Sequence, residues 1–360
     1  MSAAARGGVS DATRRDEAVA TLRRIAFLLE RAQATSYRSE AFRTAAHVVE
    51  QQPPARVATL VATGGLTELA SVGARTAGVV ELVWRGKPVP YLLELEDALV
   101  GAVAEQEKAA GDDVERAREL HAALRGDLHA HSEASDGGAS IQEMLLAALE
   151  IGHEYQAITD HSPRLTVANG LSAARLRAQL QQVAALNVAV APFRVLTGIE
   201  VDILDDGTLD QDPTLLDELD VVVASVHSKL AMDRAAMTRR MLTAVRDPRT
   251  DVLGHCTGRR VLGRRRAQSE FDARAVFSAC AERGVAVEIN CRPDRLDPPH
   301  DLLALAAELG CDFAIDTDAH APGQLDWQLT GCVRAARHGI EATRVINTWP
   351  VERLLERTHA

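Results

Sequence analysis

Hydrophobic and polar positions repeat with two different spacings along this chain, and the spacing changes near residue 124. In residues 16–33 the apolar side chains recur three or four positions apart, which predicts an amphipathic helix. Residues 39–52 repeat this spacing, and there we expect Ser39 to cap the helix and Pro53-Pro54 to stop it.

The rest of the first part also predicts helices. Residues 64–86 indicate two short helices around a turn at Gly73, and residues 103–121 indicate a solvated connecting helix. We therefore expect a small all-α domain over residues 1–100 and a connecting helix or linker over residues 101–123.

From residue 124 to residue 360, short apolar runs alternate with amphipathic segments. The seven expected strands lie within residues 123–129, 155–161, 193–203, 220–227, 251–256, 285–290 and 312–320. The helical segments between them are residues 140–152, 172–187, 234–247, 272–284 and 301–310. Apolar strands that alternate with helices indicate a parallel sheet covered on both faces. Seven such units predict an α/β fold, a closed or nearly closed (β/α) barrel.

The composition indicates which residues fill the core and in which cellular compartment the protein is expected. Apolar residues make up 46% and aromatic residues only 3%, so Leu, Val and Ala must fill the core. The opening "MSAAARGGVSDATRRDEA" lacks the apolar stretch of a signal peptide, and no run is long enough to span a membrane. The five cysteines lack CxxC spacing, which favours free thiols in a reducing, cytoplasmic setting.

Charge is distributed unevenly. Residues 1–110 hold 13 basic and 13 acidic residues, so the net charge of −11 comes from residues 111–360. A negative domain repels nucleic acid, but bound divalent metals would offset part of that charge.

Ligand-type side chains stand at the ends of the predicted strands, which gather at one mouth of a parallel barrel. Six of the 12 histidines and three carboxylates form this set: His129, His131, Asp136, His161, Glu200, His227, His255, Asp318 and His320. A single histidine at a strand end is most often a hydrogen-bonding residue. So many buried ionisable groups, however, would be unsatisfied without cations. Nine nitrogen and oxygen ligands suit two or three divalent ions, for which Zn, Mn and Fe are the candidates.

The stretch "GDLHAHSEASDGG" (residues 126–138) shows how the strand ends build such a site. His129 and His131 are one residue apart on a strand, so both side chains leave the same face and reach one ion. Asp136 returns from the following loop to meet them. Asp127 is in phase with the pair and is expected to lie outside the direct ligands.

The motifs "DLHAHS…SDGG", "ITDH", "GIEVDIL", "ASVHS", "LGH" and "DTDAH" resemble the PHP family, the polymerase and histidinol phosphatase superfamily of metal-dependent phosphoesterases. The resemblance implies a distorted (β/α)7 barrel and places the nine family ligands on the nine residues named above. "LGHCTGRRVLGRR", "EINCRPDRLD" and "VINTWPVERLL" further resemble the PHP domain at the C-terminus of bacterial family X DNA polymerases.

The first hundred residues resemble the small helical domain that opens those polymerases, through "SYRSEAFRTAAHVVEQQP" and "LTELASVGARTAGVVELV". The Pro-Gly-Ile-Gly hairpin of the family is here Ala70-Ser71-Val72-Gly73, so one glycine is lost. The region is therefore either a DNA contact or a retained structural domain. Between residues 95 and 124 there is no room for a polymerase palm, and no polymerase activity is predicted.

The expected chemistry is hydrolysis of a phosphate ester by metal-bound hydroxide. Asp160, beside His161, is expected either to orient a ligand or a metal-bound water, or to cap a strand end. The basic run 259–266 is either a solvated surface or a phosphate clamp, with Arg259 as its first candidate and Lys229 as a second.

Three functions fit these observations. The first is a phosphoesterase that acts on DNA 3′ ends or nucleotides, favoured by the polymerase-type motifs. The second is a small-molecule phosphatase of the histidinol-phosphate type, and the third is a non-catalytic DNA-binding module.

Overall fold

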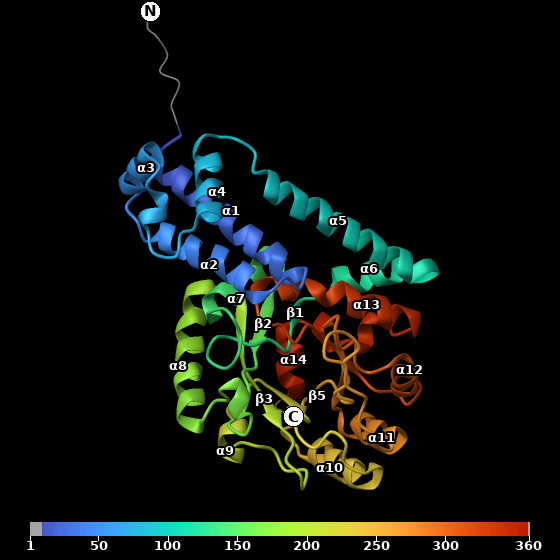
Figure 1. Ribbon diagram of the computed structural model, residues 1–360. Helices are drawn as coiled ribbons and strands as arrows, with labels where there is room; N and C mark the ends of the chain where they lie inside the picture. Colours follow the sequence, from blue (N-terminus) through green and yellow to red (C-terminus); the bar gives the residue numbers. More distant parts are fainter. Residues whose placement is uncertain (1–8, 359–360) are drawn as a thin grey trace, which may run out of the picture. The chain divides into compact units, whose positions relative to one another are not determined.

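The computed structural model describes residues 9–358, and internal contacts divide the chain into two units, residues 1–104 and 105–360 (Figure 1). The structure does not describe residues 1–8 and 359–360. The prediction that the chain opens without a signal peptide concerns residues 1–18, so part of it lies outside the described residues. Within the described part of the chain, none of the helices has the length and apolar character needed to cross a membrane.

The first unit is built from helices around one apolar core. Its elements are α1 (Asp11–Arg31), α2 (Ser36–Glu50), α3 (Pro54–Thr63), η1 (Leu66–Glu68), α4 (Ala74–Trp84) and the start of α5 (Pro90–Ala110). The predicted apolar face of α1 is buried, and it packs against α2, α3 and α4. At the start of α1 the Ser10 hydroxyl accepts a hydrogen bond from the backbone N–H of Thr13 at 3.1 Å.

The predicted cap of α2 is wrong. The helix begins at Ser36 after Thr35, and Ser39 lies inside it, where its hydroxyl donates to the Ser36 carbonyl at 3.0 Å. A serine inside a helix satisfies its hydroxyl on the preceding turn, and this competes with its use as a cap. The helix does end before the prolines, but Pro54 then begins a further helix, α3.

The prediction of a single connecting helix over residues 103–121 is also wrong. Two helices stand there, α5 and α6 (Val114–Ala123), separated by the short turn η2 (Gly111–Asp113). Gly111 takes a φ of 58°, a left-handed conformation that glycine adopts without strain and that interrupts α-helix. Ala117 and Leu120 of α6 are buried, and α6 packs against α13 (Gln328–Arg337), so α6 is not a solvated linker.

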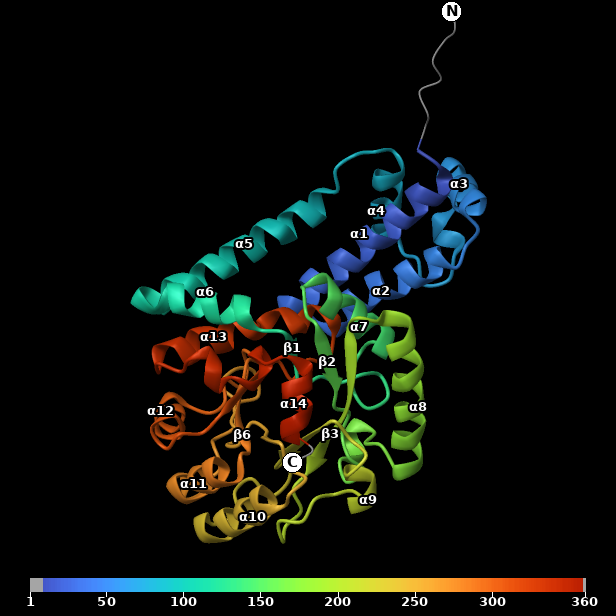
Figure 2. The ribbon, with the colours of Figure 1, turned by 180° about the vertical axis from the view of Figure 1, so that it is seen from behind.

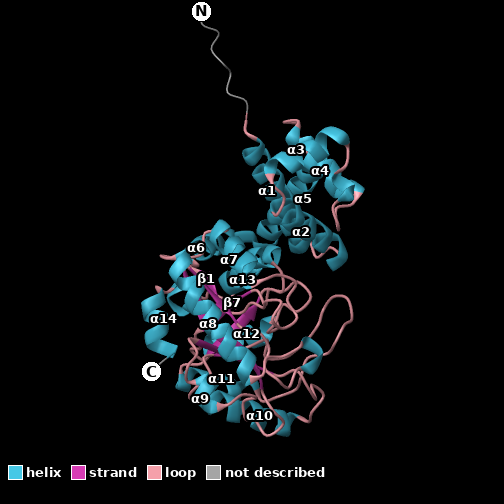
Figure 3. Ribbon diagram, turned by 90° about the vertical axis from the view of Figure 1, so that its left-hand side faces the viewer, coloured by secondary structure: helices cyan, strands magenta, loops and turns pink. Residues whose placement is uncertain are grey.

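The second unit contains the seven predicted strands, all parallel and paired in chain order, with helices outside them (Figure 3). They are β1 (Gly126–Asp127), β2 (Tyr155–Ile158), β3 (Arg194–Asp202), β4 (Val221–Ser225), β5 (Val252–Leu253), β6 (Ala286–Asn290) and β7 (Phe313–Asp316). Just beyond the ends of β1 and β7, Ala130 and Ala319 form a parallel bridge. This bridge joins the two edges, so the sheet is a nearly closed barrel, as predicted.

Helices surround the strands (Figure 2). They are α7 (Ile141–Glu150), α8 (Ala173–Val190), α9 (Pro213–Leu216), α10 (Arg234–Arg246), α11 (Ala273–Arg283), α12 (His300–Glu308), α13 and α14 (Val351–Thr358), with η3 (Thr166–Ala168), η4 (Pro322–Trp327), η5 (Ala342–Arg344) and η6 (Ile346–Thr348). The five helices predicted between strands are α7, α8, α10, α11 and α12. α9, α13 and α14 were not predicted.

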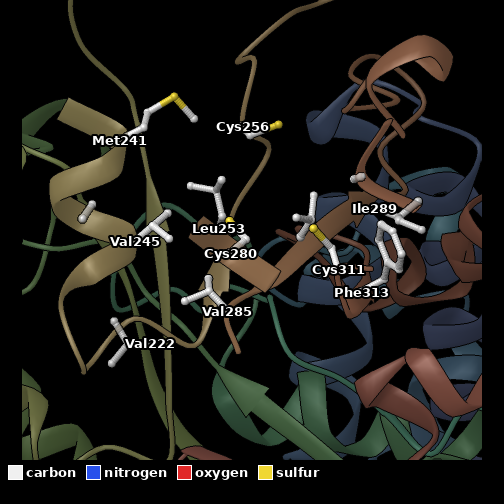
Figure 4. Close-up of a cluster of buried hydrophobic side chains, with 14 of the residues drawn as sticks. Val222, Met241, Val245, Leu253, Cys256, Cys280, Val285, Ile289, Cys311 and Phe313 are labelled. Carbon is white, nitrogen blue, oxygen red and sulfur yellow. The ribbon is translucent and has the colours of Figure 1, made fainter. Parts of the chain in front are cut away.

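The strands sort their side chains into two cores because successive residues of a strand point to opposite faces. Val221 and Val223 belong to an inner cluster that residues of η6 and α14 complete. Val222 belongs to an outer cluster between sheet and helices, where Leu253 and Cys280 also lie (Figure 4). All five cysteines are buried free thiols, which confirms the expectation of no disulfide framework.

Candidate metal centre

The predicted ligands lie where the strands of the barrel end. His129 and His131 follow β1 and are fully buried. The backbone N–H of His131 donates to the Ala319 carbonyl at 2.8 Å, which aligns this segment with the one that carries Asp318 and His320. The closure of the barrel therefore brings together ligands that are far apart in the sequence.

Glu200, near the end of β3, lies at the middle of the cluster and is 1% exposed. Ring nitrogens of five histidines lie 2.8–3.6 Å from its carboxylate oxygens: His129, His131, His161, His227 and His255. One carboxylate from β3 thus faces histidines that follow four other strands.

The remaining predicted ligands join the same cluster. Nε2 of His131 lies 3.5 Å from Oδ1 of Asp318. Oδ1 of Asp136 lies 3.3 Å from Nε2 of His320 and 3.5 Å from Nε2 of His161. All nine residues singled out from the sequence are therefore assembled at one place.

The ligand atoms form three overlapping groups, in each of which they lie within 4.8 Å of one another. The groups are His131, Asp136, His161 and His320; His129, His131 and Asp318; and His161, Glu200 and His227. Because His131 and His161 each belong to two groups, the groups adjoin. This arrangement can hold more than one divalent metal ion.

Unpaired buried atoms show that a cation fits this donor set. The following have no hydrogen-bond partner among the described residues: His129 Nε2, His131 Nδ1 and Nε2, His161 Nδ1, Glu200 Oε2, His227 Nε2 and His255 Nδ1. Buried polar atoms without partners destabilise a fold, whereas a divalent ion accepts lone pairs from imidazole nitrogen and carboxylate oxygen.

The electrostatics of the cluster agree with this fit at Glu200 and His131. Burial disfavours the charged form of Glu200, but His227, His129 and His161 around it hold its pKa well below the ordinary value. Burial together with His320 and His161 holds the pKa of His131 well below the ordinary value, so this imidazole stays neutral. Ionised carboxylates and neutral imidazoles are the forms that bind metals. At two other histidines the neighbouring carboxylates outweigh burial: they hold the pKa of His129 well above its ordinary value and raise the pKa of His227 to about 9.

Two carboxylates that sequence reasoning missed stand behind the histidines. Oε1 of Glu288 lies 2.5 Å from Nδ1 of His129, and Oδ1 of Asp202 lies 3.2 Å from Nδ1 of His227. Such partners fix the orientation and the tautomer of a ligating imidazole. A signal for Glu288 was present, because it is a charged residue within the apolar run 285–290.

The carboxylates of Asp127 and Asp160 accept hydrogen bonds from backbone N–H groups and do not face the nine predicted ligands. The buried carboxylate of Asp127 accepts from the N–H of His129 at 2.8 Å and from the N–H of Thr317 at 3.0 Å. Asp160 accepts from the N–H of Ser132 at 2.8 Å and from the side chains of Ser132, Ser135 and Gln179 at 2.5–2.6 Å. Asp160 therefore fixes the loop between His131 and Asp136.

The two candidate phosphate contacts have other partners here. Nε of Arg259 donates to the Arg295 carbonyl at 3.1 Å, and its Nη2 donates to the Leu296 carbonyl. Arg259 lines a small pocket that contains none of the nine predicted ligands. Lys229 is exposed and pairs with Asp205. A phosphate contact by Arg259 or Lys229 stays a prediction.

Two other arginines, which sequence reasoning did not single out, contact a predicted ligand. Nη1 of Arg292 lies 3.3 Å from Oδ1 of Asp318, and Nε of Arg295 lies 3.0 Å from Oδ2. Nδ2 of Asn290 donates to the same carboxylate at 3.2 Å. Asp318 has a φ of 52°, a left-handed conformation that is strained for a residue with a side chain. These contacts hold Asp318 in that conformation.

Comparison with known proteins supports the reading of the motifs. A family model described as "PHP domain" matches residues 127–292, which include seven of the nine predicted ligands. The DNA polymerase/3′-5′ exonuclease PolX of Bacillus subtilis (strain 168) is 42% identical over 224 residues, covering 62% of this chain. The match covers only 39% of PolX, so this chain spans about two fifths of that relative.

Other matches carry different names. A probable phosphatase of Thermoanaerobacter sp. (strain X514) is 28% identical over 205 residues, which is 54% of this chain and 78% of that protein. Among solved structures, histidinol phosphate phosphatase of Lactococcus lactis, complexed with Zn, L-histidinol and phosphate, matches with a TM-score of 0.42. It is 19% identical and covers 61% of this chain and 95% of that chain.

The parallel barrel, the cluster at its strand ends and the match of residues 127–292 agree with one another. The barrel of this chain is therefore a PHP domain and belongs to the superfamily of metal-dependent phosphoesterases.

Proposed function

We propose that this protein hydrolyses phosphate esters at DNA 3′ ends or in nucleotides, with divalent metal ions held at the nine-residue cluster. The observation that carries the proposal is Glu200, a buried carboxylate surrounded by five histidines whose nitrogens are largely unpaired. The identity of 42% with PolX over 224 residues favours a nucleic-acid substrate.

The nine residues would hold two to three ions, with Zn, Mn or Fe as the candidates. When bound, such ions lower the pKa of water and neutralise the charge of phosphoryl oxygens. The chain itself orients the ligands. Glu288 and Asp202 fix two imidazoles, Asp160 fixes the loop that carries Asp136, and Arg292 and Arg295 hold the carboxylate of Asp318.

The helical unit supplies a candidate DNA contact. A hollow of about 600 Å³ is lined by residues that include Arg38, Arg75 and the turn at Ser71. Ser71 replaces the glycine of the resembled hairpin, yet its φ of 64° is left-handed, so the turn keeps a glycine-type conformation although the glycine is lost. Arg38 donates to the Tyr91 hydroxyl at 2.7 Å, and the guanidinium of Arg75 lies 5.2 Å from the same ring. We propose that these arginines bind DNA phosphates.

A small-molecule phosphatase of the histidinol-phosphate type is the second candidate. The match to a probable phosphatase over 78% of its length favours phosphatase activity in general, because that protein is matched more completely than PolX. The metal cluster would serve either substrate, so the choice depends on what else contacts the phosphate ester.

A substrate screen tests both candidates. The full chain is stripped with a chelator, reconstituted separately with Zn, Mn and Fe, and assayed on 3′-labelled single-stranded DNA, nucleotides and histidinol phosphate. We expect hydrolysis of DNA ends or nucleotides in at least one metal form and none in the stripped protein. Efficient hydrolysis of histidinol phosphate alone would establish the second candidate. Protein that retains less than one metal ion per chain and hydrolyses nothing would contradict both.

A further inference from the structure

The basic run after β5 forms a short hairpin, Arg260–Arg266, that the metal centre does not use. Arg260 and Arg266 form an antiparallel bridge, with N–H to carbonyl distances of 2.9 and 3.0 Å in the two directions. Gly263, at the turn, has a φ of 62°. The hairpin is thus an ordered element whose tip is formed by Gly263 and its neighbours.

The two arginines at the tip have no acidic partners. Arg264 and Arg265 are exposed, and within the described part of the chain neither side chain forms an ion pair. The arginines at the base are used differently. Nε of Arg260 lies 3.6 Å from Oδ2 of Asp294, and Nε of Arg266 donates to the Gly258 carbonyl at 2.6 Å. Within the hairpin, the two arginines of the tip are therefore both exposed and without acidic partners, so they can contact an external anion.

The base of the hairpin is tied to the metal cluster. The N–H of Val261 donates to the Asp294 carbonyl at 2.7 Å. The Asp294 carboxylate also lies 3.4 Å from Nε of Arg292, which in turn contacts Asp318 and His320. One backbone hydrogen bond and two side-chain contacts thus connect the base of the hairpin to Asp318 and His320, two of the predicted metal ligands.

The charge of the surrounding unit makes this placement informative. Residues 111–360 carry the net charge of −11, so most of this unit repels a polyanion. The exposed arginines of the hairpin, whose base is connected to the cluster through Asp294 and Arg292, are local exceptions. A small phosphate ester held by the metals needs no charge at the tip, whereas a strand that extends away from the metals presents further phosphates.

We propose that Arg264 and Arg265 bind the phosphate backbone of single-stranded DNA whose 3′ end lies at the metal centre. The inference rests on the proposed function, and it goes further by assigning the preference for DNA over small esters to this hairpin. Each arginine would neutralise one backbone phosphate next to the nucleotide that is removed.

The test compares the wild-type chain with the double variant Arg264→Ala/Arg265→Ala. Binding of a fluorescein-labelled oligothymidylate is measured by anisotropy over a series of KCl concentrations. Hydrolysis of the same DNA and of p-nitrophenyl phosphate is measured in parallel. The matched control is Arg177→Ala/Arg239→Ala, which removes two exposed arginines from α8 and α10.

We expect the hairpin variant to bind DNA about tenfold more weakly. The slope of log Kd against log salt should decrease by about 1.4, which corresponds to two phosphate contacts on a single strand. KM for DNA should rise, turnover of p-nitrophenyl phosphate should not change, and the control should behave as the wild type.

Two results would overturn the inference. One is unchanged DNA binding and an unchanged salt slope in the hairpin variant. The other is an equal loss on DNA and on p-nitrophenyl phosphate, since this would show a general effect on the metal centre. Because binding is measured without hydrolysis, failure of the proposed function, seen as a wild-type chain that cleaves neither substrate, is distinguished from failure of the inference.

Discussion

The helical unit and the barrel differ in how the ionisable groups in their interiors are paired. The helical unit buries a core of apolar side chains together with the ion pair Arg43–Glu30, whereas pairs such as Arg23–Glu50 and Arg85–Glu81 lie on its surface. The barrel has two apolar clusters of its own, yet it also buries histidines and carboxylates at its strand ends.

The difference shows what each kind of interior contributes. Burial of apolar surface stabilises both units without further ligands. The polar cluster of the barrel, with its unpaired atoms, reduces stability unless cations or protons satisfy it. The apolar clusters of the barrel therefore offset the loss of folding stability that the polar metal site causes. Mutations in the apolar core and in the metal site should accordingly change different properties, namely stability and metal binding.

The largest expected effect comes from Glu200→Ala, which removes the carboxylate that five histidines share. We expect loss of metal and a decrease in hydrolysis on the order of a thousandfold, since metal ions supply several kcal/mol of transition-state stabilisation. Elemental analysis and an activity assay check this, with Glu218→Ala on the surface as control. A Glu200→Ala variant that keeps its metal and its activity would contradict the assignment of Glu200 as a metal ligand.

Leu22→Ala tests the other interior. Leu22 is fully buried in α1, so the free energy of unfolding of the helical unit should fall by about 2–5 kcal/mol. Metal content of the chain should not change, because the side chain lies in the other unit. Chemical denaturation followed by circular dichroism measures the loss, and Leu93→Ala, at a half-exposed position, is the control. Parallel loss of metal would mean that the two interiors are coupled.

Asp160→Asn should have an intermediate effect confined to the barrel. The amide cannot accept hydrogen bonds from all the donors of Ser132, Ser135 and Gln179, so the loop before Asp136 loosens. We expect metal affinity or activity to fall about 10- to 100-fold, as for other groups that support metal ligands. Metal titration measures this against Asp206→Asn. An unchanged metal affinity with a lowered melting temperature would instead indicate a purely structural role.

The smallest effect concerns pH and His153, which is half-buried outside the metal cluster. Burial lowers its pKa to about 4, although Nε2 of the ring lies 2.9 Å from Oε1 of Gln328. A histidine with a lowered pKa in the folded state binds its proton more readily when unfolded, so stability is lost as pH falls from about 6.5 towards 4. His153→Gln should flatten this part of the stability curve. An unchanged curve in thermal melts would contradict the role of His153.

Much of the fold could be predicted because the signals are local. The change from helical spacing to alternating apolar runs gave the two kinds of region, and all seven predicted strands are present. The ligand residues were also visible in the sequence, because parallel strands bring their C-terminal ends to one mouth and any polar residue there joins its neighbours. The cap at Ser39 failed because a serine can satisfy its hydroxyl on its own helix.

The sequence by itself determined the order of elements and the residues gathered at the strand ends, since backbone preference and burial repeat along a strand or helix. Only the tertiary structure decided which side chains contact the predicted metal ligands. Glu288 supports His129 across 159 positions of the chain, and Arg292 rather than Arg259 contacts Asp318. Such pairings depend on how the closed barrel positions distant backbone segments, and no local pattern of residues encodes that geometry.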